Sequence, residues 1–177
     1  MITPEAFLQA ELGAGIHHNN PQFMQLCRAT VNAVKHLPVI TVLDFGPGTG
    51  CYAQAFHEAG YRISVYDVFE AHRNYIRETF PHIEQMDEVQ TTDLLVFIEV
   101  AEHMTAEELD ALMGKIQPKY ILFSSTSERT DWDLAWGHIN IKEQREWVQL
   151  FQKYGYRLIS EPGVPTTWSK LFKREKS

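Results

Sequence analysis

The stretch of sequence that decides the fold reads Val39-Ile40-Thr41-Val42-Leu43-Asp44-Phe45-Gly46-Pro47-Gly48-Thr49-Gly50. Its first part, residues 39–45, is rich in β-branched side chains and lies between Pro38 and Gly46, which predicts a buried parallel strand. The glycines that follow let the backbone approach a ligand without clashes from a Cβ atom. Because ligands bind parallel sheets at the carboxyl ends of the strands, this turn is expected to border a binding site.

The rest of the chain alternates between predicted strands and helices, which is typical of a doubly wound α/β sheet with helices on both faces. Further strands are expected at 62–66, within 82–90, and at 93–98, 119–124, 157–161 and 168–173. Helices are expected at 21–36, 51–59, 69–80, 105–113 and 140–154, with a short helix before residue 20 and a polar loop at 125–140. The last two strands are joined by a short turn, so they should be antiparallel.

Composition predicts one folded domain over residues 1–177, with an N-terminal helical cap at 1–37 and an α/β core at 38–177. Cys27 and Cys51 do not form a disulfide framework, and the N-terminus lacks a signal-peptide pattern, so we expect a cytoplasmic protein. We expect no membrane partner, because no apolar stretch approaches the roughly 20 residues of a membrane span. A net charge of −7 disfavours extensive contacts with nucleic acid. The oligomeric state is not readable from the sequence.

The glycine-rich turn fits a dinucleotide poorly. The dinucleotide fingerprint requires Gly or Ala three residues after its second glycine, where this chain has Cys51. Pro47 also removes a backbone donor that a pyrophosphate would use. An NAD-dependent oxidoreductase is therefore kept only as an alternative.

Asp44, Gly46, Gly48 and Gly50 form an Asp-x-Gly-x-Gly-x-Gly pattern that resembles the first motif of class I S-adenosylmethionine-dependent methyltransferases. The resemblance implies a seven-stranded, mostly parallel sheet with an antiparallel last strand, and S-adenosylmethionine as the cofactor. It also implies a set of cofactor-binding residues beyond the glycines. These are Asp44 and Pro47 in the turn, Asp67 at the ribose with Val68 beside it, Asp87 near the adenine amine, and Glu99 after the fourth strand.

The resemblance says little about the acceptor, but insertions are short, so we expect a small molecule. A hydroxyl acceptor profits from a base, and His is the natural one. His103 follows the fourth strand and His138 lies in the 125–140 loop, so both are candidate catalytic residues. The alternative interpretation of each is a structural hydrogen-bonding residue. Trp132 and Trp136 lie in the same loop and are candidate walls of the substrate pocket.

A metal-dependent alternative rests on Glu99, Glu102 and His103, spaced i, i+3, i+4, with His138 as a fourth ligand. Two carboxylates and imidazoles suit Mg²⁺, Mn²⁺ or Zn²⁺. The pattern resembles the metal site of small-RNA 3′-end 2′-O-methyltransferases and is similar to that of quinone-biosynthesis O-methyltransferases. Because the same residues occur in family members for which no metal is implied, we assign no metal and keep an RNA 2′-O-methyltransferase as the alternative.

Overall fold

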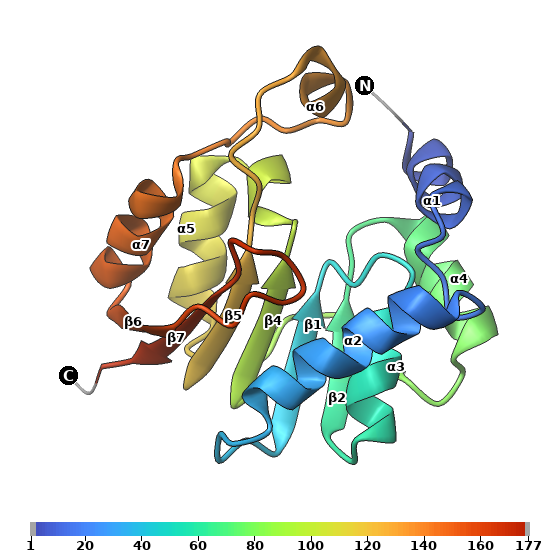
Figure 1. The fold of residues 1–177 in the computed structure, drawn as a ribbon, viewed down its shortest axis with the longest axis horizontal. Coiled ribbons are helices and arrows are strands. Elements are labelled where there is room, and N and C mark those ends of the chain that lie inside the picture. The colour runs from blue at the N-terminus through green and yellow to red at the C-terminus, as the bar shows by residue number, and fades with distance from the viewer. Residues whose placement is uncertain (1–2, 176–177) are drawn as a thin grey trace.

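A computed structural model describes residues 3–175, without the side chain of Trp132, as a seven-stranded sheet flanked by helices (Figure 1). The strands are β1 (Thr41–Phe45), β2 (Arg62–Tyr66), β3 (Glu84–Gln85), β4 (Leu94–Ile98), β5 (Tyr120–Ser124), β6 (Tyr156–Ser160) and β7 (Lys170–Arg174). The α-helices are α1 (Pro4–Gly13), α2 (Pro21–Val34), α3 (Cys51–Glu58), α4 (Glu70–Thr79), α5 (Ala106–Lys115), α6 (Asp131–Ala135) and α7 (Gln144–Lys153). A short 3₁₀ helix, η1 (Ala101–His103), follows β4.

The strand order is β3-β2-β1-β4-β5-β7-β6. All neighbouring pairs from β3 to β5 are parallel, whereas β7 pairs antiparallel with both β5 and β6. Six strands therefore share one direction, which confirms the predicted fold class. The chain reverses its direction across the sheet between β1 and β4, and this switch point creates a crevice at their carboxyl ends.

Both faces of the sheet are covered, which explains the continuous apolar runs in the central strands. On one face, Val42, Leu94 and Val96 pack with side chains from α2, α3 and α4. On the other face, their sequence neighbours Leu43, Leu95 and Phe97 pack with side chains from α5 and α7. This alternation follows from the two-residue period of a strand, and it fixes the register in which β1 presents its carboxyl end to the crevice.

Several element boundaries differ from the predictions. The 125–140 segment is not wholly a loop, because it contains the short helix α6. The final strand begins at Lys170, two residues later than expected. Helix α7 begins at Gln144 and not at Asn140, because its capping box is formed by Glu143 and Glu146, whose carboxylate accepts the Glu143 N–H at 2.7 Å.

Helices α1 and α6 lie beyond the carboxyl ends of the strands (Figure 1). Helix α1 has a single buried residue, Leu8, and packs mainly against α4. No helix within residues 3–175 is both long and apolar enough to span a membrane.

Candidate active site

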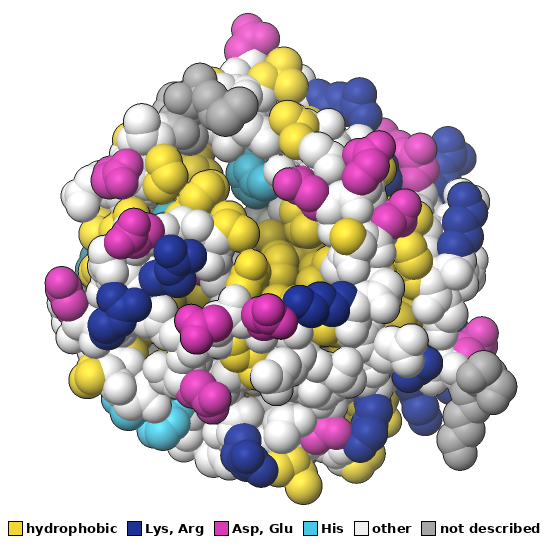
Figure 2. All heavy atoms as spheres, turned by 180° about the vertical axis from the view of Figure 1, so that it is seen from behind, with side chains coloured by type: hydrophobic (Ala, Val, Ile, Leu, Met, Phe, Trp, Pro, Cys, Tyr) yellow, Lys and Arg dark blue, Asp and Glu magenta, His cyan; other side chains and the backbone are white. Residues whose placement is uncertain are grey.

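A cavity of about 730 Å³ lies at the carboxyl ends of β1, β2 and β4. The back of the molecule shows a hollow with a hydrophobic floor, rimmed by charged side chains (Figure 2). The turn after β1, the turn after β2, the residues on either side of η1, helix α5 and the inner side of α1 all contribute lining residues. A cavity of this size at a switch point is the expected place for a small-molecule ligand.

The turn after β1 requires glycine at two positions that line the cavity. Gly46 and Gly48 have φ values of +69° and +52°, in the left-handed region that residues with a Cβ atom rarely adopt. A Cβ atom on Gly46 would lie 2.7 Å from Val100 Cγ2, and one on Gly48 would lie 2.7 Å from Glu11 Oε1. The backbone of this turn therefore forms the cavity wall directly, as the sequence predicted.

Asp44 is the buried acid of the turn. It is 2% exposed, and no hydrogen-bond donor within the described chain reaches its Oδ2. Burial, together with the nearby charge of Asp67, raises the pKa of Asp44 to about 7. A buried carboxyl without a donor is destabilising unless a ligand satisfies it, and a cationic group would do so.

Asp67 directly follows β2, the strand that pairs with β1, and it also lines the cavity. Its Oδ1 accepts the Phe69 N–H at 2.8 Å, so it also helps to begin α4. Burial raises the pKa of Asp67, although the Phe69 N–H and His72 oppose this shift. The neighbouring Val68 lines the cavity and is 65% exposed.

Two predicted cofactor residues lie differently from what the sequence suggested. Asp87 is exposed and does not line the cavity, because β3 ends at Gln85 and Asp87 falls in the following turn. Glu99 lines the cavity, but its carboxylate accepts hydrogen bonds from Ser124 Oγ, the Thr126 N–H at 3.2 Å and Trp168 Nε1 at 3.0 Å. These donors hold Glu99 at a φ of +52° and leave its carboxylate largely occupied.

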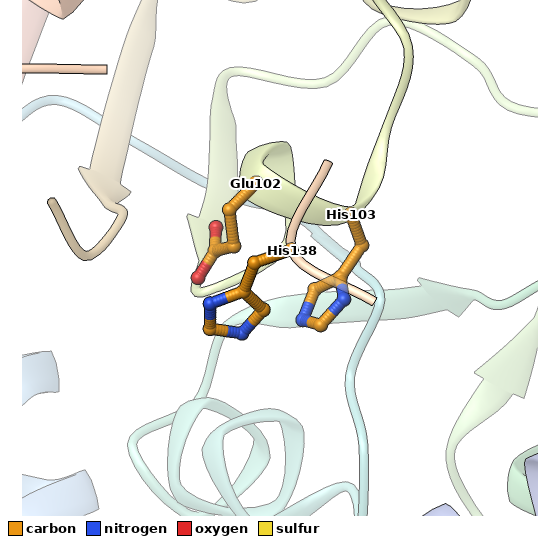
Figure 3. Close-up of side chains that lie close together, drawn as sticks. All are labelled: Glu102, His103 and His138. Carbon is orange, nitrogen blue, oxygen red and sulfur yellow. The ribbon is translucent and has the colours of Figure 1, made fainter. Parts of the chain in front are cut away.

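Three of the four predicted alternative metal ligands come together beside the cavity (Figure 3). Glu102, His103 and His138 each offer one ligand atom, and these atoms lie within 4.8 Å of one another. Glu99 is not part of this group. Ser125 Oγ donates to Glu102 Oε2 at 2.9 Å, whereas no donor within residues 3–175 reaches Glu102 Oε1.

The backbone explains how residues so far apart in sequence meet. The N–H groups of Ile139 and Asn140 donate to the carbonyl of Glu102 at 2.8 and 3.0 Å, and Asn140 Nδ2 donates to the carbonyl of Ala101 at 3.3 Å. The end of the 125–140 segment is thereby fastened onto η1. Asn140, which the sequence suggested as a helix start, instead holds His138 beside His103.

The environment keeps both imidazoles neutral near pH 7. Burial, together with the neighbouring His138, lowers the pKa of His103 to about 4. Burial also lowers the pKa of His138, although Asp133 opposes this shift from 3.7 Å away. A neutral imidazole nitrogen accepts a proton or a hydrogen bond, or ligates a metal. Of the two histidines, His103 is the one that lines the cavity.

The two predicted substrate tryptophans have different outcomes. The ring of Trp136 packs edge-on against Phe7 of α1, with centroids 4.9 Å apart, and the same Phe7 ring contacts His103. Trp136 thus lies behind a lining residue and is not itself a lining residue. The side chain of Trp132 lies outside the described part of the chain.

A family model described as a methyltransferase domain matches residues 16–161, which include every strand except β7. The chain belongs to the class I S-adenosylmethionine-dependent methyltransferases. The predicted family is therefore confirmed, and methyl transfer replaces the nicotinamide alternative. A search of curated proteins finds no match.

Solved methyltransferase structures share the fold at low identity. A S-adenosylmethionine-dependent methyltransferase from Archaeoglobus fulgidus aligns with a TM-score of 0.58 and 16% identity over 76% of this chain and 69% of that chain. Magnesium protoporphyrin IX methyltransferase from Synechocystis PCC 6803, with bound S-adenosylhomocysteine, aligns with a TM-score of 0.61 and 16% identity. The alignment covers 87% of this chain and 83% of that chain. Human N-acetylserotonin methyltransferase, in complex with S-adenosylmethionine, aligns with a TM-score of 0.60 and 16% identity over 88% of this chain and 55% of that chain.

The residues of the cavity fit the cofactor of this methyltransferase class. The glycine turn leaves room for a ligand against its backbone, the unsatisfied Oδ2 of Asp44 suits a cation, and Asp67 offers a carboxylate for ribose hydroxyls. Bound S-adenosylmethionine supplies an activated methyl group on a sulfonium. The roles of the individual residues remain predictions.

Proposed function

We propose that this methyltransferase transfers the methyl group to a hydroxyl group of a small molecule. The observation that carries this proposal is His103, a partly buried and neutral imidazole that lines the cofactor cavity. Methyl transfer is a displacement that depends mostly on positioning, and a hydroxyl acceptor additionally needs its proton removed. His103 accepts that proton, and His138, backed by Asp133, orients the His103 ring.

The enclosure of the cavity supports a small acceptor. Helix α1 and the 125–140 segment meet over it through the contact between Phe7 and Trp136. The walls are mainly apolar, although His72, Lys115 and several acids also line them, and this favours an acceptor with an apolar body. No observation in the described structure favours an RNA acceptor.

The test is transfer of labelled methyl from S-adenosylmethionine to fractions of a cell extract, with low-mass compounds and RNA assayed in parallel. We expect label in low-mass compounds as a methyl ether, and a large loss of transfer in His103→Gln. Label confined to RNA, or label on nitrogen or carbon, would contradict the proposal.

A second candidate is the same transfer assisted by a divalent cation. It is favoured by the convergence of Glu102, His103 and His138 and by the unsatisfied Oε1 of Glu102. These three side chains would hold the ion, which would polarise the acceptor hydroxyl as a Lewis acid. The other candidate ligand, Glu99, is occupied by its own donors.

The two candidates are separated by titrating Mn²⁺ alone into the protein by calorimetry. Metal assistance predicts saturable binding that Glu102→Gln abolishes and that Glu107→Gln, an exposed change on α5, leaves intact. It also predicts that a chelator stops methyl transfer. Activity that is indifferent to the chelator removes this candidate and leaves His103 as the base.

A further inference from the structure

Helix α1 packs against α4 and presents two of its side chains to the cofactor cavity. Its single buried residue is Leu8, whereas Phe7 and Glu11 line the cavity. Because α1 contributes so little to the hydrophobic core, we expect its position to depend on the cavity that it covers.

The carboxylate of Glu11 lies between the glycine turn and α4. Its Oε2 is 2.8 Å from Nε2 of His72, whose side chain is 2% exposed. Its Oε1 lies against the turn, 2.7 Å from the position that a Cβ atom on Gly48 would occupy. Within residues 3–175 no donor reaches Oε1, so one of the two oxygens is left for a ligand.

The position of Glu11 is unfavourable for the helix itself. It lies in the last turn of α1, where the macrodipole is negative and a cationic side chain would be stabilising. The last turn of α1 contains no basic residue. Glu11 and the helix terminus therefore both place negative potential at the glycine turn.

Other acids strengthen this potential. Asp44 and Asp67 line the same cavity, and each is less than 10% exposed. Two basic side chains lie nearby. Burial lowers the pKa of His72, but the hydrogen bond and charge of Glu11 outweigh burial, so that its net pKa is raised. The charge of Arg73 opposes the raised pKa of Asp67, and its guanidinium donates to the carbonyls of Asp67 and Val68. His72 is engaged by Glu11 Oε2 and Arg73 by backbone carbonyls, and neither donates to Glu11 Oε1 or to Asp44 Oδ2. These two carboxyl oxygens at the glycine turn therefore favour a ligand group that donates hydrogen bonds and carries positive charge.

We propose that Glu11 is a further cofactor-binding residue, which holds the α-ammonium group of the methionine part of S-adenosylmethionine against the glycine turn, on the side opposite Asp44. This inference rests on the cofactor assignment and not on the identity of the acceptor. Binding of the amino-acid part then also fixes α1 over the cavity, with His72 as the second contact of Glu11.

The experiment compares two ligands by titration calorimetry: S-adenosylhomocysteine and its deaminated analogue, which keeps the nucleoside, the thioether and the carboxylate. Glu11→Gln should weaken the first by about tenfold or more, the usual cost of losing a charged hydrogen bond, and leave the second within about twofold. Glu5→Gln, an exposed change on the same helix, should alter neither affinity.

The variant His72→Gln tests whether Glu11 binds the ligand or only holds α1 in place through His72. If Glu11 acts on the ammonium group, this variant keeps the preference for S-adenosylhomocysteine over the deaminated analogue, whereas Glu11→Gln loses it. Equal weakening of both ligands in Glu11→Gln, no weakening of either, or loss of the preference in His72→Gln would overturn the inference. If the unmodified protein binds neither ligand, the cofactor assignment itself fails.

Discussion

At the scale of single residues, the site is built from carboxyl and imidazole groups whose protonation is set by burial. Asp44 is the clearest case, because its pKa of about 7 lies well above that of an exposed aspartate. The folded protein without ligand therefore holds a proton on Asp44 that the unfolded chain releases near pH 4. Stability that is present below that pH is lost as the pH rises toward 7.

Asp44→Asn should therefore stabilise the ligand-free protein at pH 8 by about 2 kcal/mol, because the buried charge is removed. At pH 5 the gain should shrink, since Asp44 is then already neutral in the folded state. The same variant should bind S-adenosylhomocysteine more weakly. Urea unfolding at both pH values measures the first effect, and a gain that does not depend on pH would contradict this account of Asp44.

His103 gives a second prediction from its lowered pKa. With cofactor and acceptor saturating, the methyl-transfer rate should stay level from about pH 8 down to about pH 5, because His103 remains neutral until near pH 4. A histidine with an ordinary pKa would lose activity below about pH 6.5. His103→Gln should lower the rate by about 100-fold or more. A rate that titrates near pH 6.5 would exclude His103 as the base.

Residue identities were predictable where local chemistry is decisive. The Gly46–Gly50 turn required no tertiary information, because a buried strand followed by glycines already implies close approach of a ligand. Glu11 and His72 were not predictable, because their contact joins residues 61 positions apart and α1 has little amphipathic pattern. An acid in a last helical turn that lacks basic residues was the one available signal.

At the scale of elements, the site depends on how the 125–140 segment is fastened to η1. The sequence predicted a polar loop near the cavity but neither α6 nor the backbone hydrogen bonds to Glu102. Such bonds depend on chain geometry and not on residue type. Asp87 falls beyond β3, whose two residues pair with β2, and its place near the adenine amine stays a prediction.

Asn140→Ala removes the side-chain part of this attachment. The loss of a hydrogen bond to a backbone carbonyl should destabilise the protein by about 1 kcal/mol. The methyl-transfer rate should fall, because His138 is no longer held beside His103, whereas the affinity for S-adenosylhomocysteine should not change. Ile139→Ala, which truncates an exposed neighbour, is the matched control. An equal loss of rate in both variants would contradict the role of Asn140.

At the scale of the whole molecule, the doubly wound topology explains why one end of the sheet carries all the chemistry. The switch between β1 and β4 opens the crevice, and parallel strands bring the ends of β1, β2 and β4 to the same edge. The fold class was predictable because alternating elements and the glycine turn constrain it together. The placement of α1 and α6 over the cavity was not predictable, because it depends on tertiary contacts such as that between Phe7 and Trp136.

Cofactor binding should therefore stabilise helix α1, which lies over the cavity, as well as the sheet. At a ligand concentration about 100 times the dissociation constant, S-adenosylhomocysteine should stabilise the protein by about 2.7 kcal/mol, or roughly 5–10 °C in Tm. Hydrogen exchange should slow in α1 as well as in the turn after β1. Slowing confined to the turn would show that α1 does not close over the ligand.

The most direct test of the central claim is a crystal structure of the protein soaked with S-adenosylhomocysteine. We expect density for the ligand along the glycine turn, with the ribose at Asp67 and the amino-acid part between Asp44 and Glu11. Density for the ligand elsewhere, or a cavity that stays empty at saturating concentration, would contradict it.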